Sequence, residues 1–178
     1  MMRGVGSFLR RFRRDQDGVA SFDFVLIFPV YFMMFLAAFE TGMVMTRQIL
    51  LDRGMDMAVR IVRLNTAFPP NYDQLKDMIC QSAGLIPNCR NSLKLEMWEQ
   101  DPWGTLVLDT TPDCINRSLP VEPASVYEPG APNEIMFVRA CVHYQPFFPT
   151  AIMGTALRDS NGEYQLVTTA IYVTEPTG

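Results

Sequence analysis

The stretch DFVLIFPVYFMMFLAAFETGMVMT, residues 23–46, decides the fold of this chain. From Phe24 to Phe39 it contains no charged side chain, and from Phe24 to Thr46 it contains one acid, Glu40. As an α-helix, this run would extend about 34 Å, whereas the hydrocarbon core of a bilayer is about 30 Å thick. The stretch therefore predicts one helix that spans a membrane.

A cleaved secretory signal is the main alternative to a membrane anchor. The apolar core of such a signal is about 7–15 residues long and ends at small residues in an A-x-A pattern. This run is longer, and ETGMVMTRQ follows Phe39 instead. Residues 1–18 carry five arginines against two aspartates, which by the positive-inside rule keeps the N-terminus in the cytoplasm. We therefore expect a single-pass anchor, with everything after Arg47 on the outer side.

The helical pattern continues beyond the apolar run. In RQILLDRGMDMAVRIVRLN, residues 47–65, apolar side chains recur at steps of four, three and four, and a separate stripe is polar. Within that polar stripe, Asp56 and Arg60 have the spacing of an i,i+4 ion pair. We expect one helix from about residue 20 to 66, ended by FPPN, whose second half packs on a domain. The apolar members of the stripe are Leu51, Met55, Ala58 and Val62.

The remainder of the chain predicts a small α+β domain. Residues 72–85 have the pattern of a short amphipathic helix, and Asn71 is a suitable N-cap. Alternating segments predict an antiparallel sheet that packs against the second half of the long helix, and the proline-rich residues 110–133 predict a long loop. The Asn-Gly of DSNGE indicates a turn before the last strand. The segments expected as strands are 93–99, 105–109, 134–144 and 164–174.

Four cysteines follow the apolar run, which predicts two disulfides on the outer side of the membrane. Four cysteines allow three connectivities. Cys80 to Cys89 is the local pair, and Cys114 to Cys141 then follows by elimination, although the other connectivities stay open. A structural zinc site is the rival interpretation, but the chain has no C-x-x-C pair, and its only histidine is His143.

The sequence contains no motif that indicates catalysis. A Gly-rich phosphate loop, H-E-x-x-H and G-x-S-x-G are all missing, and His143 lies on an expected strand. DSNGE lacks the spacing of a calcium-binding EF-hand loop. The basic segment is short and adjoins the membrane run, which argues against a nucleic-acid partner. We therefore expect a chain that is not an enzyme and that uses no cofactor and no metal.

The N-terminal region contains a motif that resembles a prepilin cleavage site. Gly18 is followed by Val19-Ala20-Ser21-Phe22, then by Asp23 and Phe24. In the type IV pilin superfamily a membrane peptidase cuts after the glycine, and an acid occupies the fifth mature position. This resemblance makes residues 1–18 a basic leader that is cleaved, residues 19–46 a transmembrane helix and residues 47–178 a periplasmic domain.

The wider stretch RRDQDGVASFDFVLIFPVYFMMFLAAFETG resembles the TadE-like family of minor pilins, or pseudopilins, of the tight-adherence (Tad, or Flp) pilus. Pro29, Glu40 and Gly42 match a proline in the membrane helix and a later Glu-x-Gly of that family. The continuation of the helix, the four cysteines and PNEIMFVRACVHYQPFFPT are also similar to longer members. One departure is Asp23, because the family usually has glutamate at this position.

The resemblance gives Asp23 a role that physical chemistry supports. Cleavage after Gly18 would create an α-amine on Val19, one helical turn from Asp23, and the pairing of these charges would offset their desolvation. The alternative is that Asp23 is hydrated at headgroup level. Glu40 is either an assembly contact or a residue that reaches the outer interface, and Pro29 is expected to free a backbone carbonyl in the helix.

The resemblance implies a minor pilin that acts at initiation, tip or platform in assembly of a Flp pilus. Its implied partners are the inner membrane, the prepilin peptidase, another Tad pseudopilin, the major Flp pilin and the assembly platform. One rival is a type II secretion pseudopilin, which has the same leader. A second rival is an anchored periplasmic enzyme or ligand-binding domain, for which the helix would be only a tether.

Overall fold

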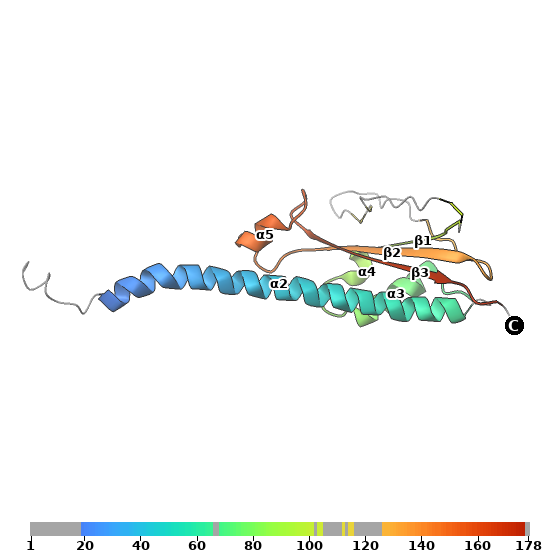
Figure 1. Cartoon of the computed structure of the whole chain (residues 1–178), viewed down its shortest axis with the longest axis horizontal. Helices are drawn as coiled ribbons and strands as arrows, with labels where there is room; N and C mark the ends of the chain where they lie inside the picture. The colour runs from blue at the N-terminus through green and yellow to red at the C-terminus, as the bar shows by residue number, and fades with distance from the viewer. Residues whose placement is uncertain are drawn as a thin grey trace, which may run out of the picture.

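The computed structural model describes residues 19–65, 68–101, 103–104, 112, 114–115 and 126–176. A single long helix runs beside a small antiparallel sheet, as Figure 1 shows, and this confirms the expected α+β class. The expected strand 105–109 and most of the expected loop 110–133 lie outside the described residues. The elements are α2 (Val19–Leu64), α3 (Tyr72–Ser82), α4 (Cys89–Ser92), β1 (Leu93–Glu99), β2 (Ile135–Tyr144), α5 (Ile152–Ala156) and β3 (Tyr164–Val173).

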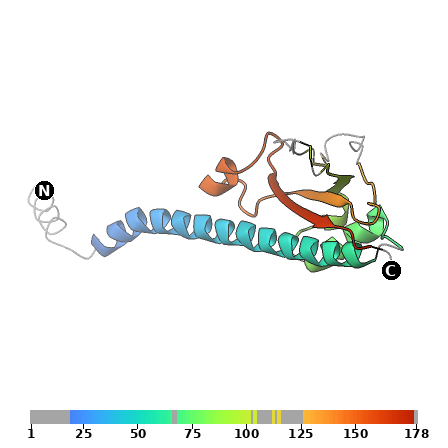
Figure 2. The same cartoon turned by 45° about the vertical axis from the view of Figure 1, so that its right-hand side comes forward.

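Helix α2 is continuous over 46 residues and passes through Pro29. Within the described part of the chain it is the one helix long and apolar enough to cross a membrane, and none of its most apolar window is buried by the rest of the protein. Its second half packs against the domain, as Figures 1 and 2 both show. The two halves of one helix therefore have different surroundings, as the change in sequence pattern predicts.

The sheet has the order β1-β2-β3, and both strand pairs are antiparallel. Its pleat sends alternate residues to opposite faces. One face of β2 carries Met136, Val138, Ala140, Val142 and Tyr144, all of which belong to the buried core. The other face carries Arg139, Cys141 and His143. The connection between β2 and β3 contains α5, so DSNGE forms only the last turn before β3.

The core lies between this sheet, α3 and the second half of α2. The expected apolar stripe of α2 is confirmed, because Leu51, Met55, Ala58 and Val62 are each at most 4% exposed. Gly54 lies between two members of the stripe and allows α3 to approach closely. A Cβ atom placed on Gly54 would lie 2.7 Å from the carbonyl oxygen of Ile79 in α3, too close for the present packing.

Helix α3 begins at Asn71, the N-cap that the sequence predicts, and the structure shows that this N-cap is part of a capping box. The Asn71 side chain accepts a hydrogen bond from the N–H of Gln74 at 2.8 Å, and the Gln74 side chain accepts one from the N–H of Asn71 at 3.0 Å. A disulfide then joins Cys80, near the end of α3, to Cys89 at the start of α4. This bridge fixes the turn that leads into β1.

Candidate functional site

The acid that marks the start of the membrane run lies on the exposed surface of α2. Asp23 is exposed and makes no ion pair with any residue that the structure describes. Gly18, the expected cleavage position, lies outside the described residues, and Val19 is the first residue of α2. A partner for the Asp23 carboxylate must therefore come from the leader region, from a new N-terminus or from another molecule.

The first half of α2 presents apolar side chains on all sides. Phe24, Phe28 and Phe32 stack in a row at i,i+4 spacing, with ring centroids 4.9 and 5.6 Å apart. These rings are 44–61% exposed, and residues 21–35 are all exposed. Such a surface is stable only in lipid or against other apolar helices.

Pro29 and Gly42 lie on parts of α2 that the domain does not cover. Pro29 is accommodated inside the helix, where it removes one backbone donor. Gly42 is exposed, and a Cβ atom placed on it would meet no atom within 4 Å. No intramolecular contact therefore explains the glycine at this position, and its small size is available to a partner helix.

Glu40 is buried, with only 1% of its surface exposed. Its two carboxylate oxygens accept hydrogen bonds from the backbone N–H groups of Phe147 and Phe148, at 3.1 and 3.2 Å. The ring of Phe39 lies 6.0 Å from each of these phenylalanine rings, in edge-to-face arrangements. Glu40 therefore fixes the segment after β2 to α2 where the membrane run meets the domain.

Arg47 lies two helical turns after Glu40 and supplies the cation of this junction. It is 5% exposed, its Nε donates to the carbonyl oxygen of Leu85 at 3.0 Å, and its guanidinium lies over the rings of Tyr144 and Phe147. Stacking over aromatic faces stabilises a buried guanidinium without the need for a salt bridge. The junction therefore contains one buried acid and one buried base, each held by groups from the other segments.

The tyrosines beside this pair are held in their neutral form. Burial, together with the negative charges of Glu40 and Tyr144, raises the pKa of Tyr164 to about 12. Burial also raises the pKa of Tyr144, although the positive charge of Arg47 acts in the opposite direction. At neutral pH both tyrosines are therefore neutral, and Glu40 faces no second anion among them.

From the sequence, Glu40 was expected to be either an assembly contact or a residue at the outer interface. Neither expectation included its hydrogen bonds to Phe147 and Phe148. Its hydrogen-bond donors lie 107 and 108 residues further along the chain, so no local pattern indicates them. The available signal was the pair Glu40 and Arg47, which are seven residues apart on one face of the helix. Such a spacing at the end of a membrane run indicates a buried polar cluster rather than two independent interfacial residues.

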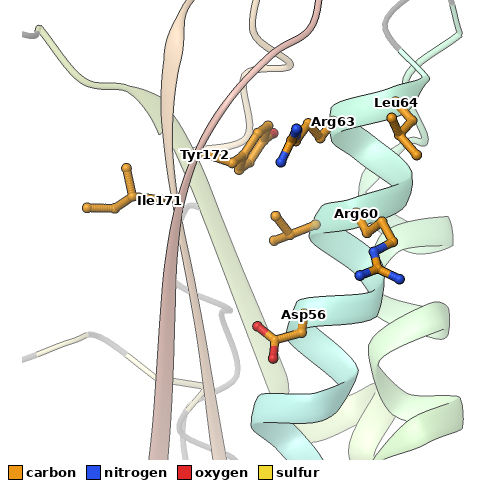
Figure 3. Close-up of a pocket in the computed structure, with 7 residues that line it drawn as sticks. Asp56, Arg60, Arg63, Leu64, Ile171 and Tyr172 are labelled. Carbon is orange, nitrogen blue, oxygen red and sulfur yellow. The ribbon is translucent and has the colours of Figure 1, made fainter.

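A shallow groove lies at the far end of α2, between this helix and β3, as Figure 3 shows. Asp56, Arg60, Arg63 and Tyr172 are among the residues that line it. Asp56 and Arg60, which are both described, do not form the ion pair that their spacing suggested. Arg63 instead pairs with Glu175 at 3.1 Å, at an exposed position where such a pair contributes little.

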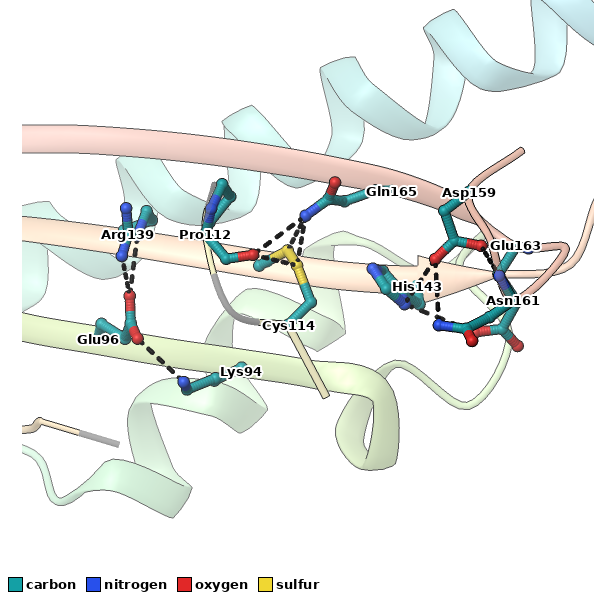
Figure 4. Close-up of a disulfide and its surroundings, with 11 residues drawn as sticks. Lys94, Glu96, Pro112, Cys114, Arg139, His143, Asp159, Asn161, Glu163 and Gln165 are labelled. Atoms are coloured by element: carbon teal, nitrogen blue, oxygen red, sulfur yellow. Dashed lines mark hydrogen bonds and ion pairs between the residues drawn. A yellow bond between two sulfur atoms is a disulfide. The ribbon is translucent and has the colours of Figure 1, made fainter. Parts of the chain in front are cut away.

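The outer face of the sheet carries a partly buried ionic network and the second disulfide, drawn in Figure 4. Glu96 on β1 lies opposite Arg139 on β2 and forms ion pairs with Arg139 at 2.6 Å and with Lys94 at 3.0 Å. The disulfide joins Cys114 to Cys141 of β2. This connectivity and the bridge at Cys80 match the pairs that the sequence led us to expect.

His143 lies beside this disulfide but does not form a metal site with it. The potential ligand atoms of Cys114, Cys141 and His143 lie within 4.8 Å of one another. The two sulfurs are bonded to each other, so neither is a thiolate that could ligate zinc. Nδ1 of His143 lies 3.8 Å from Asp159 and 3.6 Å from Glu163, two acids of the turn before β3. From its place on β2, the histidine therefore contacts the turn that precedes β3.

These features define a class of protein: a small α+β domain, stapled by two disulfides, on a single apolar helix long enough to span a membrane. The family model described as TadE-like protein matches residues 18–60. The chain is therefore similar to TadE-like proteins over the exposed apolar helix and the first part of its packing stripe. No curated protein and no solved structure matches the chain significantly.

Proposed function

We propose that this chain is a minor pilin, or pseudopilin, that acts in assembly of a Tad (Flp) pilus. In this proposal the prepilin peptidase cuts after Gly18, residues 19–46 anchor the mature chain in the inner membrane, and the domain lies in the periplasm. The observation that supports it best is the first half of α2. Residues 21–35 are all exposed, and the one acid among them, Asp23, forms no ion pair with a described residue.

Pairing between Asp23 and a mature N-terminus follows from the cost of an isolated carboxylate near lipid. An acid at the centre of a membrane helix costs about 2.5–3.5 kcal/mol on insertion scales, and an amine one turn away would offset part of this cost. The amine of Val19, of the same chain or of a neighbouring subunit, meets this requirement. Pairing between subunits would also set the register of packed helices.

Intact mass and N-terminal sequencing of the protein from its native membrane test the cleavage. We expect a mature chain that begins at Val19 and that is not formed when the prepilin peptidase is absent. A chain that keeps residues 1–18 in the presence of the peptidase would contradict the proposal and leave an ordinary signal anchor. Proteins that co-purify with the mature chain then distinguish a Tad assembly from a type II secretion machine.

The pairing itself is tested with Asp23→Asn, and Asp23→Glu serves as the matched control. Asp23→Asn removes the charge but retains the size, so we expect normal cleavage with failed incorporation into the pilus assembly. Asp23→Glu keeps the charge and has the residue usual in the family, so assembly should persist. Normal assembly of Asp23→Asn would mean that Asp23 is merely hydrated at the membrane surface.

A further inference from the structure

The segment between β2 and β3 places an apolar loop against the membrane helix rather than against the sheet. This loop, residues 145–157, is called the junction loop below, and it contains α5. Figures 1 and 2 both show α5 displaced from the strands toward the N-terminal half of α2. A groove of about 410 Å³ between the two elements is lined by Ile152 of α5 and, on α2, by Pro29, Val30, Met33, Met34 and Ala37.

The position of this groove along α2 limits what can cover it. Every α2 residue that lines it lies inside the uncharged run from Phe24 to Phe39. Whatever surrounds that part of α2 therefore also surrounds Ile152. If α2 spans the bilayer as the proposed function requires, the same hydrocarbon meets both walls of the groove.

The junction loop has the composition of a segment that enters lipid. Its sequence, QPFFPTAIMGTAL, contains no charged residue, and charge returns only at Arg158 and Asp159. Phe147, Ile152 and Leu157 are 48%, 66% and 52% exposed, although each is strongly apolar. Exposed apolar side chains that lie next to a membrane helix continue its hydrophobic surface.

Several backbone donors of the junction loop already have acceptors within the protein. Glu40 accepts from Phe147 and Phe148, and internal carbonyls accept from Ala151, Thr155 and Leu157. The two prolines of the loop carry no N–H donor. The Thr155 hydroxyl donates to the carbonyl oxygen of Ile152 at 2.9 Å. Each of these groups would otherwise add to the cost of transfer into hydrocarbon.

Close packing keeps the loop in this position. A Cβ atom placed on Gly154 would lie 2.0 Å from the carbonyl oxygen of Phe148, so α5 folds directly onto the segment that Glu40 holds. The Glu40 carboxylate therefore fixes the loop to α2, and Gly154 fixes α5 to the loop. The apolar side chains are held at one height along the membrane helix.

We propose that the junction loop inserts into the outer leaflet of the membrane and that lipid acyl chains fill the groove between α5 and α2. The protein then contacts the bilayer through two elements instead of one. This inference rests on the membrane placement of α2 in the proposed function, but not on cleavage or on pilus assembly. The second contact would hold the sheet at a fixed height and tilt above the membrane.

Site-directed spin labelling of the full-length protein in phosphatidylethanolamine–phosphatidylglycerol liposomes tests the proposal. Ile152→Cys reports on the loop. Ile171→Cys on β3, with a 57% exposed side chain, is the matched control outside the membrane, and Val30→Cys on α2, 63% exposed, is the reference inside it. Accessibility to oxygen and to a water-soluble nickel chelate is measured by power saturation, after peptide mapping has verified both native disulfides.

The label at Ile152 should resemble that at Val30, with an oxygen-to-nickel accessibility ratio several-fold above that at Ile171. A ratio equal to that at Ile171, while Val30 remains in lipid, would overturn the leaflet insertion but leave the membrane helix intact. Nickel access at Val30 as well would overturn the membrane placement and with it the proposed function. Shielding of Ile152 from both reagents would show that protein, not lipid, covers the groove.

Discussion

The Glu40 carboxylate connects two segments that are more than 100 residues apart in the chain. Each of its oxygens accepts one backbone N–H, and burial leaves the carboxylate only 1% exposed. A hydrogen bond to a charged group contributes more than a neutral one, and an unsatisfied buried donor costs about 1–3 kcal/mol. Stability at the junction therefore depends on both oxygens of one side chain.

Glu40→Gln should lower the free energy of unfolding by about 1–3 kcal/mol, because the amide NH₂ cannot accept from the second N–H. Urea unfolding of the purified full chain in detergent, followed by near-UV circular dichroism, measures this change. Asp56→Asn is the control, since Asp56 is an exposed acid on the same helix, and it should change stability by less than about 0.5 kcal/mol. Equal effects of both substitutions would exclude a specific role for the Glu40 contacts.

Asp159 makes the turn before β3 sensitive to acid. Burial acts to raise the pKa of this carboxyl, but the N–H groups of Glu163 and Asn161 and the charge of His143 outweigh it, so the pKa lies below its usual 3.8. A carboxyl with a lowered pKa in the folded state contributes stability above pH 3.8, and this contribution is lost as the pH falls through the folded value.

Asp159→Asn should therefore reduce the loss of thermal stability that the protein shows on acidification. Melting temperatures measured from about pH 6 to pH 2 should fall less steeply in the variant than in the unchanged protein, with the difference confined to the acidic end. Asp56→Asn again provides the comparison and should keep the original pH dependence. Parallel curves for Asp159→Asn and the unchanged protein would contradict the assignment.

Among the secondary-structure elements, local periodicity predicted α2, α3 and the three described strands. It succeeded for α2 because the stripe from Leu51 to Val62 and the apolar run before it are each visible within one segment. It missed α5, since five residues between a Pro-Thr turn and Leu157 carry no helical period. It also missed the partners of Glu40 and the need for Gly54, because both depend on how distant elements approach one another.

The contact between α2 and α3 depends on the missing side chain at Gly54. Gly54→Ala should destabilise the domain by about 1–3 kcal/mol, because the added methyl group would force the helix away from the Ile79 carbonyl. Gly42→Ala is the matched control, with open space around the new methyl group. In a helix interior this change should stabilise by up to about 1 kcal/mol.

Unfolding of the two glycine variants in urea checks these opposite signs. If both variants lose stability equally, the close approach of α3 to Gly54 does not explain the destabilisation by Gly54→Ala. Pilus assembly then provides a second measurement for Gly42→Ala. Failure to assemble, with stability retained, would show that Gly42 contacts a partner helix.

At the scale of the whole molecule, two disulfides restrain different lengths of chain. The Cys80–Cys89 bridge closes a separation of 9 residues, and the Cys114–Cys141 bridge closes one of 27. In the chain-entropy description, a longer closed loop gives a larger stabilisation, with a difference of about 1 kcal/mol here. Replacement of Cys114 and Cys141 by serine should therefore cost more than replacement of Cys80 and Cys89. Chemical unfolding of the two double variants measures the order, and a reversed order would assign the greater constraint to the short turn.

The unbroken course of α2 also has a mechanical consequence. The sheet packs along the second half of the same helix whose first half is apolar, and Glu40 and Arg47 hold the domain where these halves meet. No linker separates the apolar half of α2 from the domain, so a force on the N-terminal end of this helix is transmitted directly to the domain. If a machine lifted the helix from the bilayer, the domain would rise by about 1.5 Å for each residue extracted. The helix and the domain would then move together as one rigid body, and not as a domain on a flexible tether.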